Sequence, residues 1–203
     1  MKRFLALFVL IVASASARAE APVILVFGDS ISAGYGLPLE QGWVELLRTR
    51  LKAQGYGYQV VNASVSGETT AGGLARLPRA LELHHPGIVI LELGGNDGLR
   101  GLPVAQMRMN LAQMTSLSTA AGAKVLLLGM RMPPNYGPEY TKQFAMVFSD
   151  LATEKKISLV PFLLTDIALS PALLQADDIH PNAQGQPILL DNVWPTLKPL
   201  LHK

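Results

Sequence analysis

A serine, an aspartate and a histidine in this sequence have the residue types and spacing that nucleophilic catalysis requires. Ser30 comes soon after the apolar run at residues 23–27, and His180 lies in the polar segment at residues 176–182. A serine becomes a nucleophile when a histidine accepts its proton and an acid orients that histidine. Asp177, three residues before His180, can fold back to accept the Nδ1 proton and leave Nε2 for Ser30. We therefore predict a triad of these three residues.

The other candidates for the base and the acid are less suitable. Three histidines lie at the end of a predicted helix or at the chain terminus: His84, His85 and His202. Pro181 restricts His180 to an extended backbone and can itself occupy the first position of the last helix. Asp178 is expected to point out of the site or to cap that helix, so Asp177 is the preferred acid.

Acyl transfer also requires hydrogen-bond donors directed at the oxyanion that forms when the serine attacks a carbonyl. Gly67 follows the predicted strand at residues 58–61, and its lack of a Cβ leaves its N–H accessible to a substrate. Asn96 follows the predicted strand at residues 88–93 and offers a side-chain N–H. Together with the backbone N–H of Ser30, these groups are the three predicted donors of an oxyanion hole.

Each of these motifs also has a purely structural interpretation. Asp29 or Ser30 can cap a helix, and the segments around Gly67 and Asn96 are common turn sequences. His180 taken alone is as readily an ordinary surface residue. The combination favours catalysis, because all of these residues map to one edge of one predicted sheet.

Alternating strands and helices predict that sheet. Apolar runs with β-branched residues predict strands at residues 23–27, 58–61, 88–93, 125–128 and 157–160. Predicted helices cover residues 43–54, 71–83, 103–121, 139–155 and 187–201, the last interrupted or ended near Pro195. Such alternation indicates an α/β protein whose parallel sheet is covered on both faces. Open α/β folds bind ligands at the carboxyl edge of the sheet, where the loops after the strands emerge.

The amino-terminal segment is predicted to be a leader. Lys2 and Arg3 precede the apolar residues 4–13, and residues 17–19 form the Ala-x-Ala pattern of a signal peptidase site. We expect residues 1–19 to be cleaved, residues 20–203 to form one domain, and the mature protein to be periplasmic or secreted. No later segment has the roughly 20 apolar residues that a transmembrane helix needs.

Composition and missing motifs exclude several classes of function. Without the three cationic residues of the leader the net charge falls from +2 to −1, which leaves no basic stripe for nucleic acid. The chain has no cysteine and no second histidine at ligand spacing from His180, so we expect no thiolate chemistry and no metal site. The glycine-rich loops of nucleotide-binding proteins are also missing. The expected partner is a small molecule, and a monomer is favoured.

Four residues together resemble the set that names the SGNH family of GDSL-type hydrolases: Ser30, Gly67, Asn96 and His180. The segments GDSISAGYG, NASVSGETT, ELGGNDGLRG, NYGPEY and DDIHPN look like the bacterial periplasmic branch of that family, which comprises acyl-CoA thioesterase, lysophospholipase and arylesterase activities. The resemblance spans most of the chain after the leader. It implies a flavodoxin-like three-layer α/β/α sandwich with about five parallel strands, no cofactor, and catalysis by Ser30 with Asp177 and His180.

We therefore expect a serine esterase or thioesterase that hydrolyses aryl esters, acyl-CoA or lysophospholipids through an acyl-enzyme. Five residues are predicted to line a groove for the acyl chain: Leu99, Leu102, Met130, Met132 and Tyr136. Gly98 and Gly101 indicate a small lid over residues 98–102.

Two alternative functions stay open on the sequence. The same triad can serve a carbohydrate acetylesterase, although two Trp and five Tyr provide few rings for stacking on sugars. A non-catalytic exported binding protein would account for the leader and the glycine-rich loops. A binding protein, however, would not explain why Ser30, Asp177 and His180 occur together.

Overall fold

Five parallel strands form the centre of the fold. The structure is a computed structural model that describes residues 21–203, so the leader predicted for residues 1–19 lies outside the described residues. The sheet order is β2-β1-β3-β4-β5, with β1 (Val23–Gly28), β2 (Gln59–Asn62), β3 (Ile88–Glu92), β4 (Lys124–Leu128) and β5 (Ser158–Val160). Each strand agrees with its predicted range to within one residue at either end.

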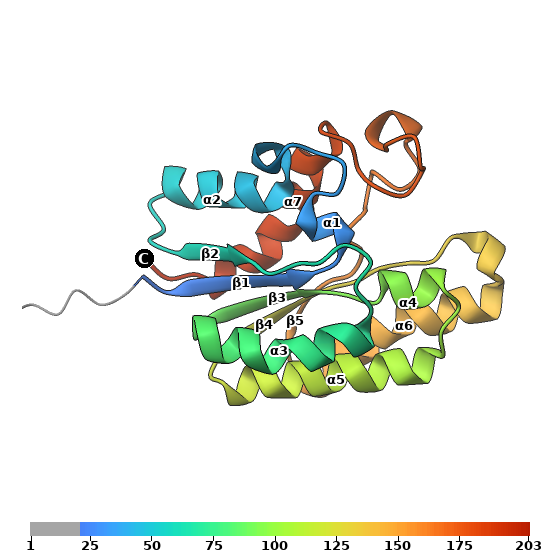
Figure 1. The fold of residues 1–203 in the computed structure, drawn as a ribbon, viewed down its shortest axis with the longest axis horizontal. Helices are drawn as coiled ribbons and strands as arrows, with labels where there is room; N and C mark the ends of the chain where they lie inside the picture. The colour runs from blue at the N-terminus through green and yellow to red at the C-terminus, as the bar shows by residue number, and fades with distance from the viewer. Residues whose placement is uncertain (1–20) are drawn as a thin grey trace, which may run out of the picture.

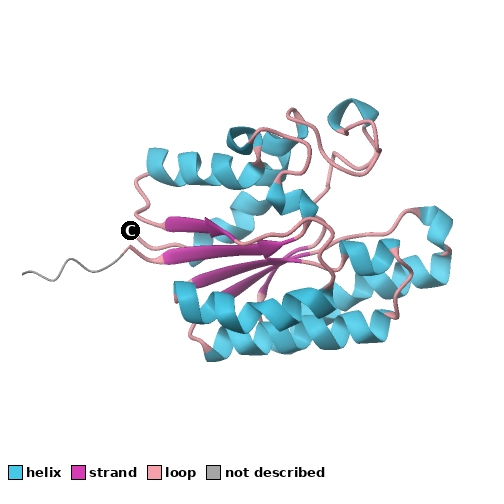
Figure 2. Ribbon diagram, viewed as in Figure 1, coloured by secondary structure: helices cyan, strands magenta, loops and turns pink. Residues whose placement is uncertain are grey.

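Helices cover both faces of this sheet, as Figures 1 and 2 show. One face carries α2 (Trp43–Ala53) and α7 (Gly185–Leu197), and the other carries α3 (Thr70–His84), α5 (Val104–Ala120) and α6 (Pro138–Lys155). This arrangement and strand order confirm the predicted flavodoxin-like three-layer sandwich. None of the helices within residues 21–203 is long and apolar enough to cross a membrane.

The adjacent inner strands β1 and β3 are almost completely buried. The side chains of residues 24–27 in β1 and 88–91 in β3 are at most 2% exposed. Strands buried on both faces read as unbroken apolar runs, which is why the sequence predicted them. Burial of each large aliphatic side chain contributes about 1.5–3 kcal/mol. The core therefore holds the carboxyl ends of β1 and β3 side by side, with Gly28 paired to Glu92.

Two short helices at the carboxyl edge were not predicted. They are α1 (Ser30–Ala33) and α4 (Gly95–Leu99), which follow β1 and β3 after one or two residues. Helices of this length show no apolar periodicity, so the sequence pattern gave no helix range there, although it allowed Asp29 or Ser30 to cap a helix.

The remaining connections contain short 3₁₀ helices, and the last helix differs from its prediction. The 3₁₀ helices cover Leu39–Gln41, Pro134–Tyr136, Pro171–Leu173 and Lys198–Leu200. Helix α7 begins at Gly185, continues past Pro195 and ends at Leu197. Pro195 therefore does not interrupt the helix, which ends two residues after it and is followed by one turn of 3₁₀ helix at Lys198–Leu200.

Candidate active site

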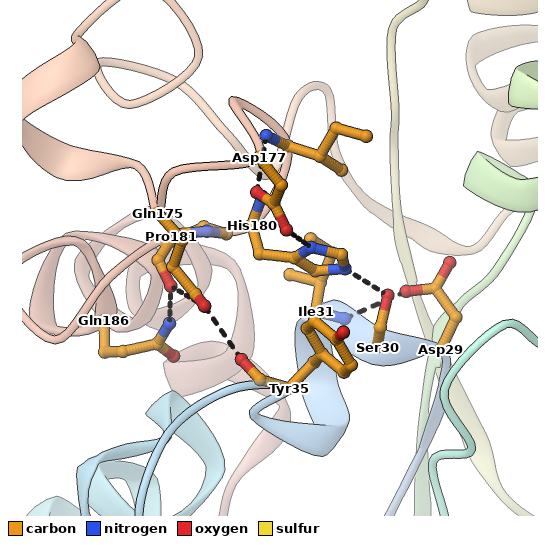
Figure 3. Close-up of polar contacts among 10 residues, drawn as sticks. Asp29, Ser30, Ile31, Tyr35, Gln175, Asp177, His180, Pro181 and Gln186 are labelled. Carbon is orange, nitrogen blue, oxygen red and sulfur yellow. Dashed lines mark hydrogen bonds and ion pairs between the residues drawn. The ribbon is translucent and has the colours of Figure 1, made fainter.

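Ser30, Asp177 and His180 form a continuous chain of hydrogen bonds at the carboxyl edge of the sheet. The Nε2 atom of His180 lies 2.8 Å from Ser30 Oγ, and its Nδ1 lies 2.6 Å from Asp177 Oδ2. Figure 3 shows the imidazole between the serine and the aspartate. These distances lie within the range for strong hydrogen bonds. The imidazole can therefore accept a proton from the serine hydroxyl while its Nδ1–H donates to the carboxylate.

Asp177 is held by the loop that it belongs to. Its Oδ1 accepts hydrogen bonds from the backbone N–H groups of Ile179 and His180, both at 3.0 Å. Partial burial raises the pKa of Asp177, but the hydrogen bonds from His180 and Ile179 outweigh it and lower this pKa to about 2. The carboxylate is therefore charged at neutral pH, as a group that stabilises an imidazolium must be.

Asp29 connects the serine to the predicted oxyanion donor Asn96. Its Oδ1 accepts the N–H of Ile31 at 3.0 Å and caps α1, which agrees with the structural interpretation of this residue. Its Oδ2 accepts a hydrogen bond from the side-chain amide of Asn96, also at 3.0 Å. One amide N–H of Asn96 is thus used to fix its orientation, and the other is left for a ligand.

A second carboxyl group, Glu92, lies beneath Asp29 in the core. Its Oε2 accepts the Ser32 hydroxyl at 2.7 Å and the N–H of Asp29 at 3.2 Å. A Cβ at Gly28 would lie 2.5 Å from the same oxygen, so only glycine fits at the end of β1. Burial raises the pKa of Asp29 to about 6, and burial together with the Asp29 charge raises the pKa of Glu92 well above its usual value. The sequence analysis gave Glu92 no role, although Glu92 begins the quoted segment ELGGNDGLRG, because no residue near it in the sequence indicates a partner for its carboxyl group.

The three predicted oxyanion donors face one pocket. Ser30, Gly67 and Asn96 all belong to its lining. Gly67 adopts a φ of +79°, a conformation that favours glycine, and its carbonyl accepts a hydrogen bond from the Arg100 guanidinium at 2.9 Å. Within residues 21–203, no acceptor is found for the backbone N–H of Ser30 or of Gly67. Both N–H groups are therefore available to a ligand oxygen.

The pocket that contains Ser30 has a volume of about 650 Å³, which suits a small organic ligand. Most of its wall is apolar and comes from the loops after β4 and β5 and from the His180 loop. These apolar residues include Met130, Met132, Pro133, Pro134, Phe162, Leu164, Leu169, Leu174 and Ile179, and Leu99 of α4 joins them. The arrangement joins a serine–histidine pair to a cavity that can hold a hydrocarbon chain.

A family model described as the GDSL-like lipase/acylhydrolase family matches residues 26–188 of this chain. The chain belongs to this family. As a GDSL-like acylhydrolase it is an enzyme that hydrolyses ester or thioester bonds of small-molecule substrates, which confirms the predicted class of function.

Individual relatives agree with the family assignment. The chain is 56% identical to "Esterase TesA" of Pseudomonas aeruginosa over 184 residues, 91% of this chain and 92% of the relative. It is 41% identical to "Thioesterase 1/protease 1/lysophospholipase L1" of Escherichia coli K12 over 184 residues, 91% of this chain and 87% of the relative. A crystal structure of TesA matches with a TM-score of 0.87 at 56% identity, covering 88% of this chain and 99% of that one.

The predicted acyl-groove residues of this acylhydrolase divide into two groups. Leu99, Met130 and Met132 line the pocket, whereas Leu102 and Tyr136 are not among its lining residues. The Tyr136 hydroxyl instead donates a hydrogen bond to the Leu99 carbonyl at 3.0 Å. Tyr136 thus supports the backbone of a pocket residue from outside.

The structure gives a different role to the glycines of the predicted lid. Gly98 lies inside α4, where a Cβ would overlap Met132 and approach Phe144. The Tyr140 hydroxyl donates to the carbonyls of Gly98 and Leu102 at 3.4 and 3.2 Å. Gly98 therefore permits close packing, and the Tyr140 hydroxyl binds the backbone of this segment; a lid over residues 98–102 stays a prediction.

Several pocket residues escaped the sequence analysis. Tyr35 packs its ring 4.6 Å from that of His180, centroid to centroid, and Phe162 lies under the Arg131 guanidinium at 4.9 Å. Asp178 lines the pocket and does not cap α7, whose first N–H groups are met by the side chain of Asn182 instead. Phe162 follows β5, so its position just after a predicted strand could have indicated that it lies at the ligand-binding edge of the sheet.

Among residues 21–203, no group of three or more histidine, aspartate or glutamate side chains is arranged to hold a metal ion.

Proposed function

We propose that this acylhydrolase uses Ser30 as its nucleophile, His180 as its general base and acid, and Asp177 as the residue that orients His180. The observation that carries the proposal is the 2.8 Å separation of Ser30 Oγ from His180 Nε2, both in the lining of a largely apolar pocket. The hydrogen bond from His180 Nδ1 to Asp177 supports the same assignment, because it leaves Nε2 unprotonated and able to accept the serine proton.

The reaction proceeds in two stages through an acyl-enzyme. His180 accepts the proton of Ser30 as Oγ attacks the carbonyl carbon, and the N–H groups of Ser30 and Gly67 and the amide of Asn96 stabilise the oxyanion. His180 then donates that proton to the departing alcohol or thiol. In the second stage His180 takes a proton from water, the resulting hydroxide attacks the acyl group, and Ser30 recovers its proton.

The substrate class follows from the walls of the pocket. A cavity lined by leucine, methionine, proline and phenylalanine side chains favours esters and thioesters with an apolar acyl chain or an aromatic leaving group. Acyl-CoA, lysophospholipids and aryl esters are therefore the proposed substrates. An acetylated carbohydrate is the second candidate, but no observation on the pocket favours it.

Residues 1–19 are proposed to be an export signal, so the mature enzyme is periplasmic or secreted and consists of one hydrolase domain at residues 20–203. The Ala-x-Ala pattern at residues 17–19 supports this cleavage site. The mature enzyme is further proposed to act as a monomer, with no cofactor and no metal ion.

The central test compares the mature enzyme with Ser30→Ala. Both are assayed on p-nitrophenyl esters from acetyl to palmitoyl, on palmitoyl-CoA and on a lysophospholipid, and both are treated with a fluorophosphonate. We expect the variant to lose hydrolysis by about 10⁶-fold and to lose labelling completely, because no other side chain can form the acyl-enzyme. Equal labelling of both proteins would overturn the assignment of Ser30. Activity on acetyl esters of sugars alone would favour the second candidate substrate.

A further inference from the structure

The loop that carries Asp177 and His180 is closed on itself. Leu174 and Pro181 form an isolated antiparallel bridge, and the N–H of Gln175 donates to the carbonyl of His180 at 2.7 Å. With the hydrogen bonds to Asp177 Oδ1, these contacts set the shape of the loop. They do not set its distance from Ser30, which lies on a different element and 150 residues earlier in the chain.

The side chain of Gln175 joins this loop to the segment that carries Ser30. Its Nε2 donates to the carbonyl of Tyr35 at 2.8 Å and to the carbonyl of Pro181 at 3.2 Å. The N–H of Tyr35 in turn donates to the carbonyl of Ser30 at 3.1 Å. One amide therefore connects the residue after His180 to the turn that is hydrogen-bonded to the nucleophile (Figure 3).

A second glutamine acts on the same carbonyl from the other side. Gln186 in α7 is 1% exposed, and its Nε2 donates to the Pro181 carbonyl at 3.1 Å. Its Oε1 accepts the N–H of Trp43, the first residue of α2, at 2.9 Å. Pro181 is thus tied through two glutamine amides to α2, α7 and the Ser30 segment.

The chain leaves space for this bridge at Gly36. A Cβ there would overlap the Oε1 atom of Gln175, and Gly36 has a φ of +76°, which side chains rarely adopt. The Tyr35 ring next to it packs against the His180 ring. The Gln175 amide, the Tyr35 turn and the imidazole therefore form one packed unit.

We propose that Gln175 and Gln186 are positioning residues that hold His180 within hydrogen-bond distance of Ser30 through the carbonyl of Pro181. This inference rests on the proposed function, in which His180 transfers the proton of Ser30. Proton transfer requires donor and acceptor within about 3 Å, and a displacement of about 1 Å can lower a rate by 10²-fold. Neither glutamine needs to touch the substrate for this effect.

The first experiment uses Gln175→Met, which keeps the length of the side chain but removes both donors. The measurements are the rate constant and the stoichiometry of labelling by a fluorophosphonate, with kcat and KM for p-nitrophenyl butyrate. We expect labelling and kcat to slow by about 10- to 100-fold, with KM within about twofold and full labelling stoichiometry. Gln186→Met is expected to act in the same direction, and the double variant to lose less than the product of the two single losses, because both amides hold one carbonyl.

The matched control is Gln184→Met. Gln184 is exposed, stands two residues before Gln186, and its side chain makes no hydrogen bond within residues 21–203. We expect its labelling rate and kcat to equal those of the parent enzyme. The same substitution at two nearby positions thus separates loss of the bridge from a general effect of methionine.

Two outcomes would overturn the positioning role. One is labelling of Gln175→Met at the parent rate; the other is reduced stoichiometry with an unchanged rate per labelled site, which would indicate only a loss of folded protein. Failure of the proposed function looks different, because the parent enzyme would then not be labelled at Ser30 at all.

Discussion

The two halves of the active site are held in different ways. Ser30 and Asn96 stand on short helices after the two central strands, and their neighbours Asp29 and Glu92 are almost completely buried. Asp177 and His180 lie on a surface loop, with side chains 37% and 16% exposed. The sheet therefore positions the proposed nucleophile and oxyanion donors, whereas local hydrogen bonds and two glutamine amides hold the loop of the proposed base.

The protein core thus preorganises one half of the site, and a surface loop preorganises the other. The sheet-edge half cannot shift without disturbing β1 and β3, because Glu92 binds both the Asp29 N–H and the Ser32 hydroxyl. The internal hydrogen bonds of the loop half do not depend on Ser30, so loss of the glutamine bridge should let this loop shift as a unit. Substitutions in the loop should therefore affect catalysis more than stability, and substitutions beneath Ser30 should affect both.

After Ser30→Ala, the largest effect is expected from Asp177→Asn in the loop half. The new Oδ1 can still accept the N–H groups of Ile179 and His180, so the loop should keep its shape. The new amide would face Nδ1 of His180 as a donor and favour the wrong tautomer, which lowers kcat by about 10⁴-fold. Steady-state kinetics with an unfolding curve checks this, and a large loss of stability would show that Asp177 mainly supports the loop.

A smaller loss is expected from Asn96→Ala in the sheet-edge half. This variant removes one oxyanion donor and leaves Ser30 and His180 in place, so kcat should fall by about 10²- to 10³-fold. Labelling by a fluorophosphonate should slow as well, because its phosphoryl oxygen needs the same donors. Unchanged kcat on both ester and thioester substrates would exclude Asn96 from the oxyanion hole.

The smallest change in rate, but a distinct change in stability, is expected from Asp29→Asn. Asp29 accepts one hydrogen bond at each carboxylate oxygen, whereas the side chain of an asparagine has only one oxygen. If that oxygen keeps the N–H of Ile31, the Asn96 amide loses its partner, and kcat should fall by about tenfold. Burial raises the pKa of Asp29 from 3.8 to about 6, so the stability that this group contributes is complete below pH 3.8 and is lost as the pH rises through about 6.

The asparagine variant removes that titration. Its stability relative to the parent should therefore increase by roughly 2–3 kcal/mol between pH 4 and pH 7.5. Urea unfolding of both proteins across this range measures the difference. Parallel stability curves for the two proteins would show that Asp29 does not carry the raised pKa.

The sequence predicted the parts of the site that depend on local spacing. An aspartate three residues before a histidine can reach its ring within one turn, so Asp177 and His180 were paired without knowledge of the fold. Ser30 and Asn96 were placed by the apolar strands before them. Glu92 was not predicted, because its partners Asp29 and Ser32 lie about 60 residues away and meet it only through sheet pairing.

The amino-acid sequence by itself determined the five strands, the main helices, the family and the residues proposed for catalysis, because burial and turn formation leave local patterns. Only the tertiary structure decided which apolar side chains line the pocket, with Phe162 and Leu164 included and Leu102 and Tyr136 outside it. It also decided the 2.8 Å contact between Ser30 and His180 and the glutamine bridge that supports it. The contacts of His180 with Ser30, of Gln175 with Tyr35 and of Gln186 with Trp43 join residues 140 to 150 positions apart, so their geometry depends on how the layers pack.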